Sequence, residues 1–62
     1  MNSKQIIRAL KKDGWYKVSS EGSHLQYKHS AKPGKVTIPH PKESFSRKMI
    51  KSIMKQSGIK DF

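Results

Sequence analysis

Hydrophobic residues near the start of the chain recur with a helical period. Three aliphatic side chains share one stripe of the segment: Ile6, Ile7 and Leu10. Lys and Arg occupy most of the outward positions of the segment, which predicts an amphipathic helix over residues 3–13. Asn2 or Ser3 can cap its start, and Gly14 suits the left-handed position that follows a helix end.

The same period returns near the end of the chain. Four apolar side chains form this second stripe: Met49, Ile50, Ile53 and Met54. Ser46 is a favourable N-cap and Gly58 a favourable stop, so we predict a second helix over residues 46–57. Basic residues fill the outward positions of both helices.

Between the helices the pattern changes to the alternation that is typical of β-strands. Three short segments show it: residues 15–20, 24–29 and 35–39. The turns at Glu21-Gly22 and at 32–34 are too short for parallel crossovers, so the strands form an antiparallel meander. We therefore predict one domain over residues 1–62 of the α+β class, in the order α-β-β-β-α. Both helices pack on one face of the three-stranded sheet, and the other face, here called the open face, stays uncovered.

Strand alternation also predicts which side chains share each face. A hairpin centred on Glu21-Gly22 gives two core-facing pairs, Val18 with Leu25 and Tyr16 with Tyr27. It gives two pairs on the open face, Ser19 with His24 and Lys17 with Gln26. In the third strand Val36 and Ile38 belong to the core, and Lys35 and Thr37 to the open face. We thus expect His24 on the open face, close to the hairpin turn.

Charge is the strongest compositional signal. Fourteen Lys and Arg against four Asp and Glu give a net charge of +10 over 62 residues. A domain this basic is typical of proteins that meet a polyanion, and nucleic acid is the favoured partner. The chain has no cysteine and no apolar run of the length of a signal or membrane segment, so we expect a cytoplasmic protein with no membrane partner.

Three histidines are the candidates for chemistry. His24, among hydroxyls and cations, is placed to meet a phosphodiester, although an exposed strand histidine without a role is the alternative reading. His29 should lie toward the helices as a partly buried or edge residue. His40 either reaches the open face or is a loop residue between two prolines. Their spacing matches no compact metal motif, and the acids are scattered, so we expect no metal and no cofactor.

Four motifs together resemble one known family. They are Gly14-Trp15, Gly22-Ser23-His24-x-x-Tyr27, Val36-Thr37-Ile38-Pro39-His40-Pro41 and the segment from Lys51 to Ile59. Their order and spacing are similar to those of the HicA toxin family. The chain departs from many relatives at Leu25, where they carry a second histidine, and at Lys48-Met49, where they carry Gly-Thr.

The resemblance implies a function. HicA proteins are messenger RNA interferases of type II toxin–antitoxin pairs, with a fold like a double-stranded-RNA-binding domain. It places the catalytic histidine at His24, with Gly22 and Ser23 forming the turn that presents it. It also implies a HicB-like antitoxin that blocks this histidine, and messenger RNA as the substrate.

Cleavage of RNA through its 2′-OH requires few protein groups. RNA supplies its own nucleophile, since a base that removes the 2′-OH proton lets that oxygen attack the adjacent phosphorus. A histidine of ordinary pKa, about 6.5, can be that base. Lys17 and Lys28 are candidates to stabilise the charge that develops on the phosphate.

We therefore expect a metal-independent endoribonuclease with His24 as the catalytic residue. The expected RNA-binding residues are Lys17, Ser23, Gln26, Lys28 and Lys35. The alternative is a non-catalytic RNA-binding module of the same fold, which has no need of a histidine in a Gly-Ser turn. DNA binding is less favoured, because no recognition helix is evident.

Overall fold

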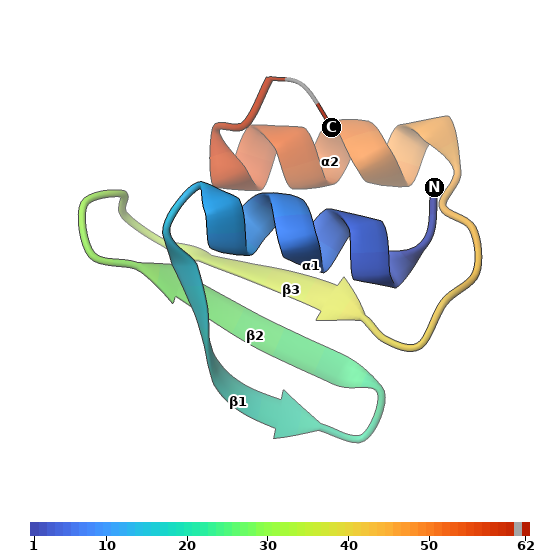
Figure 1. The fold of residues 1–62 in the computed structure, drawn as a ribbon, viewed down its shortest axis with the longest axis horizontal. Coiled ribbons are helices and arrows are strands. Elements are labelled where there is room, and N and C mark those ends of the chain that lie inside the picture. Colours follow the sequence, from blue (N-terminus) through green and yellow to red (C-terminus); the bar gives the residue numbers. More distant parts are fainter. Residues whose placement is uncertain (61) are drawn as a thin grey trace.

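Two helices and three strands make up the fold. The computed structural model describes residues 1–60 and 62. Its elements are α1 (Ser3–Lys12), β1 (Trp15–Glu21), β2 (His24–His29), β3 (Lys35–Pro39) and α2 (Arg47–Ser57). The strands form one antiparallel sheet in the order β1-β2-β3. Both helices lie on the same side of this sheet, as Figure 1 shows, so the predicted α-β-β-β-α class is confirmed.

Both helices begin and end at residues that the sequence marks for this. Asn2 caps α1 in a reciprocal pair with Gln5, in which each side chain accepts a hydrogen bond of 2.9 Å from the other's backbone N–H. The Ser46 hydroxyl caps α2 by accepting a hydrogen bond of 3.2 Å from the backbone N–H of Met49. Gly58 ends α2 with a left-handed φ of 73°, and Gly14 follows α1 with a φ of 104°. These caps fix where each helix starts and stops.

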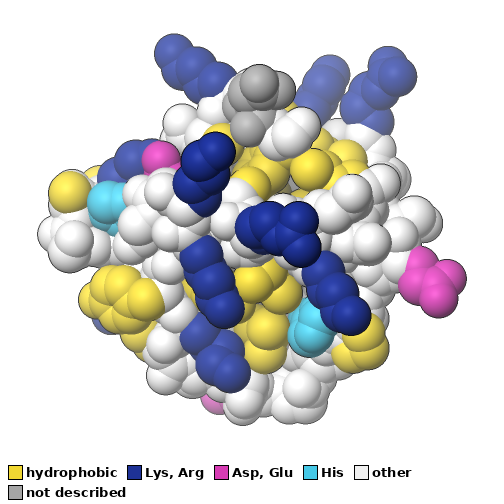
Figure 2. Space-filling model, viewed as in Figure 1, with side chains coloured by type: hydrophobic (Ala, Val, Ile, Leu, Met, Phe, Trp, Pro, Cys, Tyr) yellow, Lys and Arg dark blue, Asp and Glu magenta, His cyan; other side chains and the backbone are white. Residues whose placement is uncertain are grey.

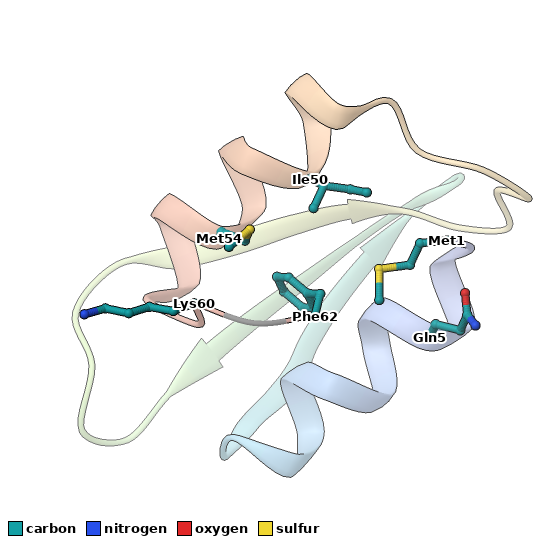
Figure 3. Close-up of a pocket in the computed structure, with 6 residues that line it drawn as sticks. All are labelled: Met1, Gln5, Ile50, Met54, Lys60 and Phe62. Atoms are coloured by element: carbon teal, nitrogen blue, oxygen red, sulfur yellow. The ribbon is translucent and has the colours of Figure 1, made fainter.

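The core lies between the helices and the sheet. Eight buried apolar side chains form it: Ile6, Leu10, Trp15, Tyr27, Val36, Ile38, Phe45 and Ile53. Burial of the Tyr27 phenol raises its pKa. At the outer margin of this core, the Phe62 side chain lies between the two helices, with Met1 and Met54 beside it (Figure 3).

The turn between β1 and β2 lies one residue later than predicted. It consists of Gly22 and Ser23, and Glu21 is a strand residue opposite His24. Gly22 has a positive φ of 58° and Ser23 does not, which is the pattern of a type II′ turn with glycine at its first central position. The expected centre at Glu21-Gly22 was therefore wrong.

β1 also contains a bulge at Val18. Lys17 lies opposite Tyr27 and Ser19 opposite Gln26, so Val18 has no partner of its own in β2. Such an extra residue reverses the alternation of the strand on its far side. The side chains of residues 15–17, which precede the bulge, therefore point to the opposite faces of the sheet from those they would have in a strand without a bulge.

The bulge decides which large side chain of β1 is buried. Trp15 is 2% exposed, whereas Tyr16 and Val18 are 48% and 45% exposed. The prediction that Tyr16 and Val18 face the core was wrong. An indole offers roughly 200 Å² of surface for burial, more than the valine that an unbulged strand would bury, so this register removes more apolar surface from water.

Candidate functional site

His24 is the first residue of β2 and directly follows the Gly22–Ser23 turn. Its neighbours across the sheet are Glu21 of β1 and Pro39 of β3. The next β2 residues with the opposite parity, Leu25 and Tyr27, pack toward the helices. His24 therefore points to the open face, as predicted, and its side chain is exposed.

The pairing arranges the open face in three rows of side chains. The first row is Glu21, His24 and Pro39; the second is Ser19, Gln26 and Thr37; the third is Tyr16, Lys28 and Lys35. All are exposed except Gln26 and Pro39, which are half-buried. Among the expected RNA-binding residues, Gln26, Lys28 and Lys35 lie on this face, and Ser23 lies in the turn beside it.

Lys17 is not part of the open face. The register sets it opposite Tyr27, whose side chain is buried under the helices, so Lys17 points to that same side of the sheet. It stays exposed at the edge strand. The expectation that Lys17 shares a face with His24 was wrong, because the bulge at Val18 reverses the parity between them.

The lysines of the third row are far from His24. Lys28 follows His24 by four residues, which at about 3.3 Å per residue separates their Cα atoms by about 13 Å. Lys35 lies opposite Lys28 in the same row. The two side chains meet one phosphate only if both lean toward each other along the strand. Both lysines suit a phosphate further along a bound strand.

Two residues of the open face were not expected there from the sequence. Glu21 was assigned to the turn, yet it is the carboxylate opposite His24. Directly opposite residues have Cβ atoms about 4.5–5.5 Å apart, so this carboxylate can approach the imidazole. Tyr16 was assigned to the core, yet it lies beside Lys28. The glycine that a type II′ turn requires at its first central position was the signal that could have revealed Glu21, whereas the placement of Tyr16 depends on the bulge.

His29 has a structural role. Its Nε2 lies 2.7 Å from the Asp13 carbonyl oxygen, and its Nδ1 accepts from the backbone N–H groups of Ala31 and Lys32 at 2.9 and 3.1 Å. A carbonyl only accepts and a backbone N–H only donates, so the neutral ring with its hydrogen on Nε2 satisfies all three contacts. The ring also meets Trp15 edge-on at 5.2 Å. His29 thus ties the end of α1 to the β2–β3 connection.

The Lys32 amine completes this end of the fold. It forms an ion pair with Asp13 and donates a hydrogen bond of 3.1 Å to the Ser57 carbonyl oxygen at the end of α2. The hydrogen bond from Lys32 holds the pKa of the Asp13 carboxyl below its ordinary value. Both helix C-termini therefore meet a cation, the charge that their dipoles favour.

His40 lies on the helix side of the sheet. Its Nδ1 is 2.7 Å from the hydroxyl oxygen of Ser3 in α1, and its backbone N–H donates to the Ser23 carbonyl at 2.6 Å. Of the two alternatives, the loop position is therefore the observed one. The backbone of His40 adjoins the turn that presents His24, while its ring is directed to α1.

No group of three or more His, Asp or Glu side chains in residues 1–60 and 62 is arranged to hold a metal ion. Within the same residues, neither helix has the length and apolar content that crossing a membrane requires.

The fold and the site define a small, basic α+β protein that presents a histidine from a Gly-Ser turn onto an uncovered sheet. A family model described as the HicA toxin of bacterial toxin–antitoxin matches residues 3–59. The chain therefore belongs to the HicA toxin family. A search among curated proteins returned no match. Family membership makes the protein the toxin of a toxin–antitoxin pair, with an antitoxin as its partner and RNA as its class of substrate.

Proposed function

We propose that this protein is an endoribonuclease that cleaves messenger RNA with His24 as the general base, and that a HicB-like antitoxin neutralises it. One observation carries the proposal. Within the described residues, the His24 ring has no hydrogen-bond partner, whereas His29 and His40 are both engaged. An exposed imidazole on an uncovered sheet face is free to meet a substrate.

The reaction follows from the substrate's own nucleophile. Neutral His24 takes the proton of a ribose 2′-OH, and that oxygen forms a bond to the adjacent phosphorus. The bond from phosphorus to the 5′-oxygen breaks, and the leaving oxygen receives a proton from the imidazolium or from water. A positioned base contributes about 10²–10⁴-fold to the rate. The Glu21 carboxylate lies opposite His24 in the sheet, on the same face. No step requires a metal ion.

The rest of the open face supplies a track for the RNA. The second row offers hydroxyl and amide groups to sugars and phosphates. In the third row, the half-exposed ring of Tyr16 lies beside Lys28, and Lys35 lies beyond Lys28 on the next strand. An aromatic ring with cations on one side suits a base stacked on the ring and a phosphate on the amines, whatever the base sequence. The messenger RNA of the cytoplasm is the polyanion that this face fits.

The same face suits an antitoxin. A complementary acidic partner that covers it gains from the net charge of +10 and from the exposed ring of Tyr16. An antitoxin that covers the first row buries His24, so the general base can no longer reach RNA. Inhibition and catalysis thus compete for one surface.

The alternative is an RNA-binding module without catalysis. Incubation of purified protein with RNA separates the two, with His24→Ala and His29→Ala compared after both are shown to be folded by circular dichroism. We expect His24→Ala to lose at least about 10²-fold in cleavage and to keep RNA binding, and His29→Ala to keep both. Undiminished cleavage by His24→Ala would remove this histidine from the mechanism.

A further inference from the structure

A second basic site lies on the helix side of the molecule. A groove of about 430 Å³ between α1 and the β3–α2 connection is lined by Lys4, Ile7, Arg8, Lys11 and His40. An adjoining hollow of about 420 Å³ shares Lys4 and His40 and adds Lys42 and Glu43. Figure 2 shows Lys and Arg side chains gathered over the middle of the molecule, around α1, with acidic side chains near the outline.

The ring of His40 is held with one edge toward the groove. Ser3 is 2% exposed, and its hydroxyl oxygen accepts the backbone N–H of Lys42 at 3.0 Å. Its own hydrogen needs an acceptor, and the Nδ1 of His40, at 2.7 Å, is the one present among the described residues. The neutral ring then carries its hydrogen on Nε2. His40 therefore presents a fixed N–H donor at the edge that faces away from Ser3.

The charges around this donor have one sign. Lys4, Arg8 and Lys11 are spaced at i, i+4 and i+7 along α1, so their side chains lie on one side of the helix. The first turn of α1 carries no acid. Among the described residues, no carboxylate lines the groove itself, since Glu43 belongs to the adjoining hollow. Like charges at this spacing destabilise a helix, and an anion between them relieves the repulsion.

The groove is linked to the turn that presents His24 through the backbone of His40. The backbone N–H of His40 donates to the carbonyl of Ser23, the residue directly before His24. The His24 ring lies on the open face and the His40 ring on the helix side, so the two sites flank the same end of the sheet. A chain of phosphates that crosses the first row of the open face meets this groove on passing around the turn.

We propose that the groove binds a backbone phosphate of the RNA, beyond the turn from the bond that is cut. The anion receives the Nε2–H of His40 and the guanidinium of Arg8, which can bind two phosphate oxygens at once. Lys4 and Lys11 supply further charge from either side. The proposal rests on the proposed function for the identity of the polyanion, and on the groove itself for the binding of phosphate.

The salt dependence of RNA binding tests the groove. In the His24→Ala background, Lys4→Ala/Arg8→Ala is compared with Lys51→Ala/Lys55→Ala, which removes two exposed charges at the same i, i+4 spacing from α2. Loss of one phosphate contact on single-stranded RNA reduces the slope of log Kd against log salt by about 0.7. We expect this reduction from the α1 pair and none from the α2 pair. Equal slopes for the two pairs would overturn the proposal.

A second measurement separates this proposal from the nuclease assignment. Inorganic phosphate is titrated into the wild-type protein at constant ionic strength, and the imidazole Cε1–H signals are followed by NMR. We expect a saturating shift at His40 and none at His29, whose ring nitrogens are both engaged. This response in a protein that does not cleave RNA would contradict the nuclease assignment and support the phosphate site in the groove. Cleavage of RNA without a response at His40, and with an unchanged salt slope for the Lys4→Ala/Arg8→Ala variant, would contradict the phosphate site and leave the nuclease assignment standing.

Discussion

Two valines provide a matched test of the register of β1. Val18 occupies the bulge and is 45% exposed, whereas Val36 of β3 is fully buried. Truncation of each to alanine is the same chemical change in a strand, so the intrinsic strand preference of valine over alanine affects both variants in the same direction. The structure nevertheless predicts different losses of stability, because only Val36 is surrounded by other side chains.

The expected magnitudes follow from burial. Two buried methyl groups are worth about 1.6 kcal/mol of transfer free energy at about 0.8 kcal/mol each. The cavity left behind adds to this, so we expect Val36→Ala to cost about 2–3 kcal/mol. About half of the Val18 side chain already contacts water, so Val18→Ala should cost about 0.8 kcal/mol. The difference between the two costs is a large share of the free energy of unfolding, which is roughly 3–9 kcal/mol for a 62-residue chain.

Urea unfolding measures both costs. Trp15 is retained in both variants, so its fluorescence and far-UV circular dichroism can follow the transition. With a slope near 1 kcal/mol per molar urea, the midpoint of Val36→Ala should lie about 1–2 M below that of Val18→Ala. A cost at Val18 equal to or above that at Val36 would refute the reasoning. Val18 would then face the helices without a bulge, and the row that brings Tyr16 onto the open face would be wrong.

Three further predictions concern the ends of the helices and the open face. His29→Ala should lower stability by about 1–3 kcal/mol, because it removes the hydrogen-bond partner of the Asp13 carbonyl and of the Ala31 and Lys32 N–H groups, and a thermal melt unchanged from wild type would contradict this. The pKa of Asp13 is lowered in the folded state by Lys32, so its contribution is present above the unfolded pKa near 3.8 and is lost as pH falls through the folded value. The unfolding midpoint of the wild type should therefore decrease as the pH is lowered below about 4, and that of Asp13→Asn should decrease less. Parallel curves of midpoint against pH for the two proteins would show that the ion pair does not contribute to stability. Tyr16→Ala, in the His24→Ala background, should weaken RNA binding by about 1–3 kcal/mol if a base stacks on the ring, and a filter-binding assay that shows equal affinity would exclude the stacking.

Much of the fold could be predicted from local signals. The helix ends were predictable because caps act over a few residues: Asn2, Ser46 and Gly58 each satisfy groups within their own helix turn. The faces of β2 and β3 were predictable because both strands alternate without interruption, as the burial of Tyr27 and Val36 shows. The position of His24 on the open face followed from β2 alone.

The register of β1 could not be predicted in the same way. Alternation in Tyr16-Lys17-Val18 is compatible with either face, and the choice depends on a bulge whose stabilisation is non-local. Burial of Trp15 against α1 and His29 outweighs burial of Val18, and this competition is visible only in the assembled fold. The misplacement of Lys17 is a direct consequence.

The position of His40 was equally non-local. Its ring is fixed by Ser3, which is 37 residues away in the chain, and by the way the β3–α2 connection crosses the start of α1. No spacing rule links a serine at a helix start to a histidine after a strand. The sequence indicated a loop between prolines, but the groove that this loop forms with the basic side of α1 required the structure.

Cleavage of RNA by way of its own 2′-hydroxyl, with His24 as the base, is the central claim, and the ends of the products test it most directly. The wild-type protein is incubated with end-labelled RNA in the presence of a chelator, and with the same strand carrying a single deoxyribose at the mapped cleavage position. We expect the all-ribose strand to give a 2′,3′-cyclic phosphate and a 5′-hydroxyl, and the substituted strand to bind equally and to stay intact at that position. Products with 5′-phosphates, or cleavage of the deoxyribose strand at the same bond, would contradict this account.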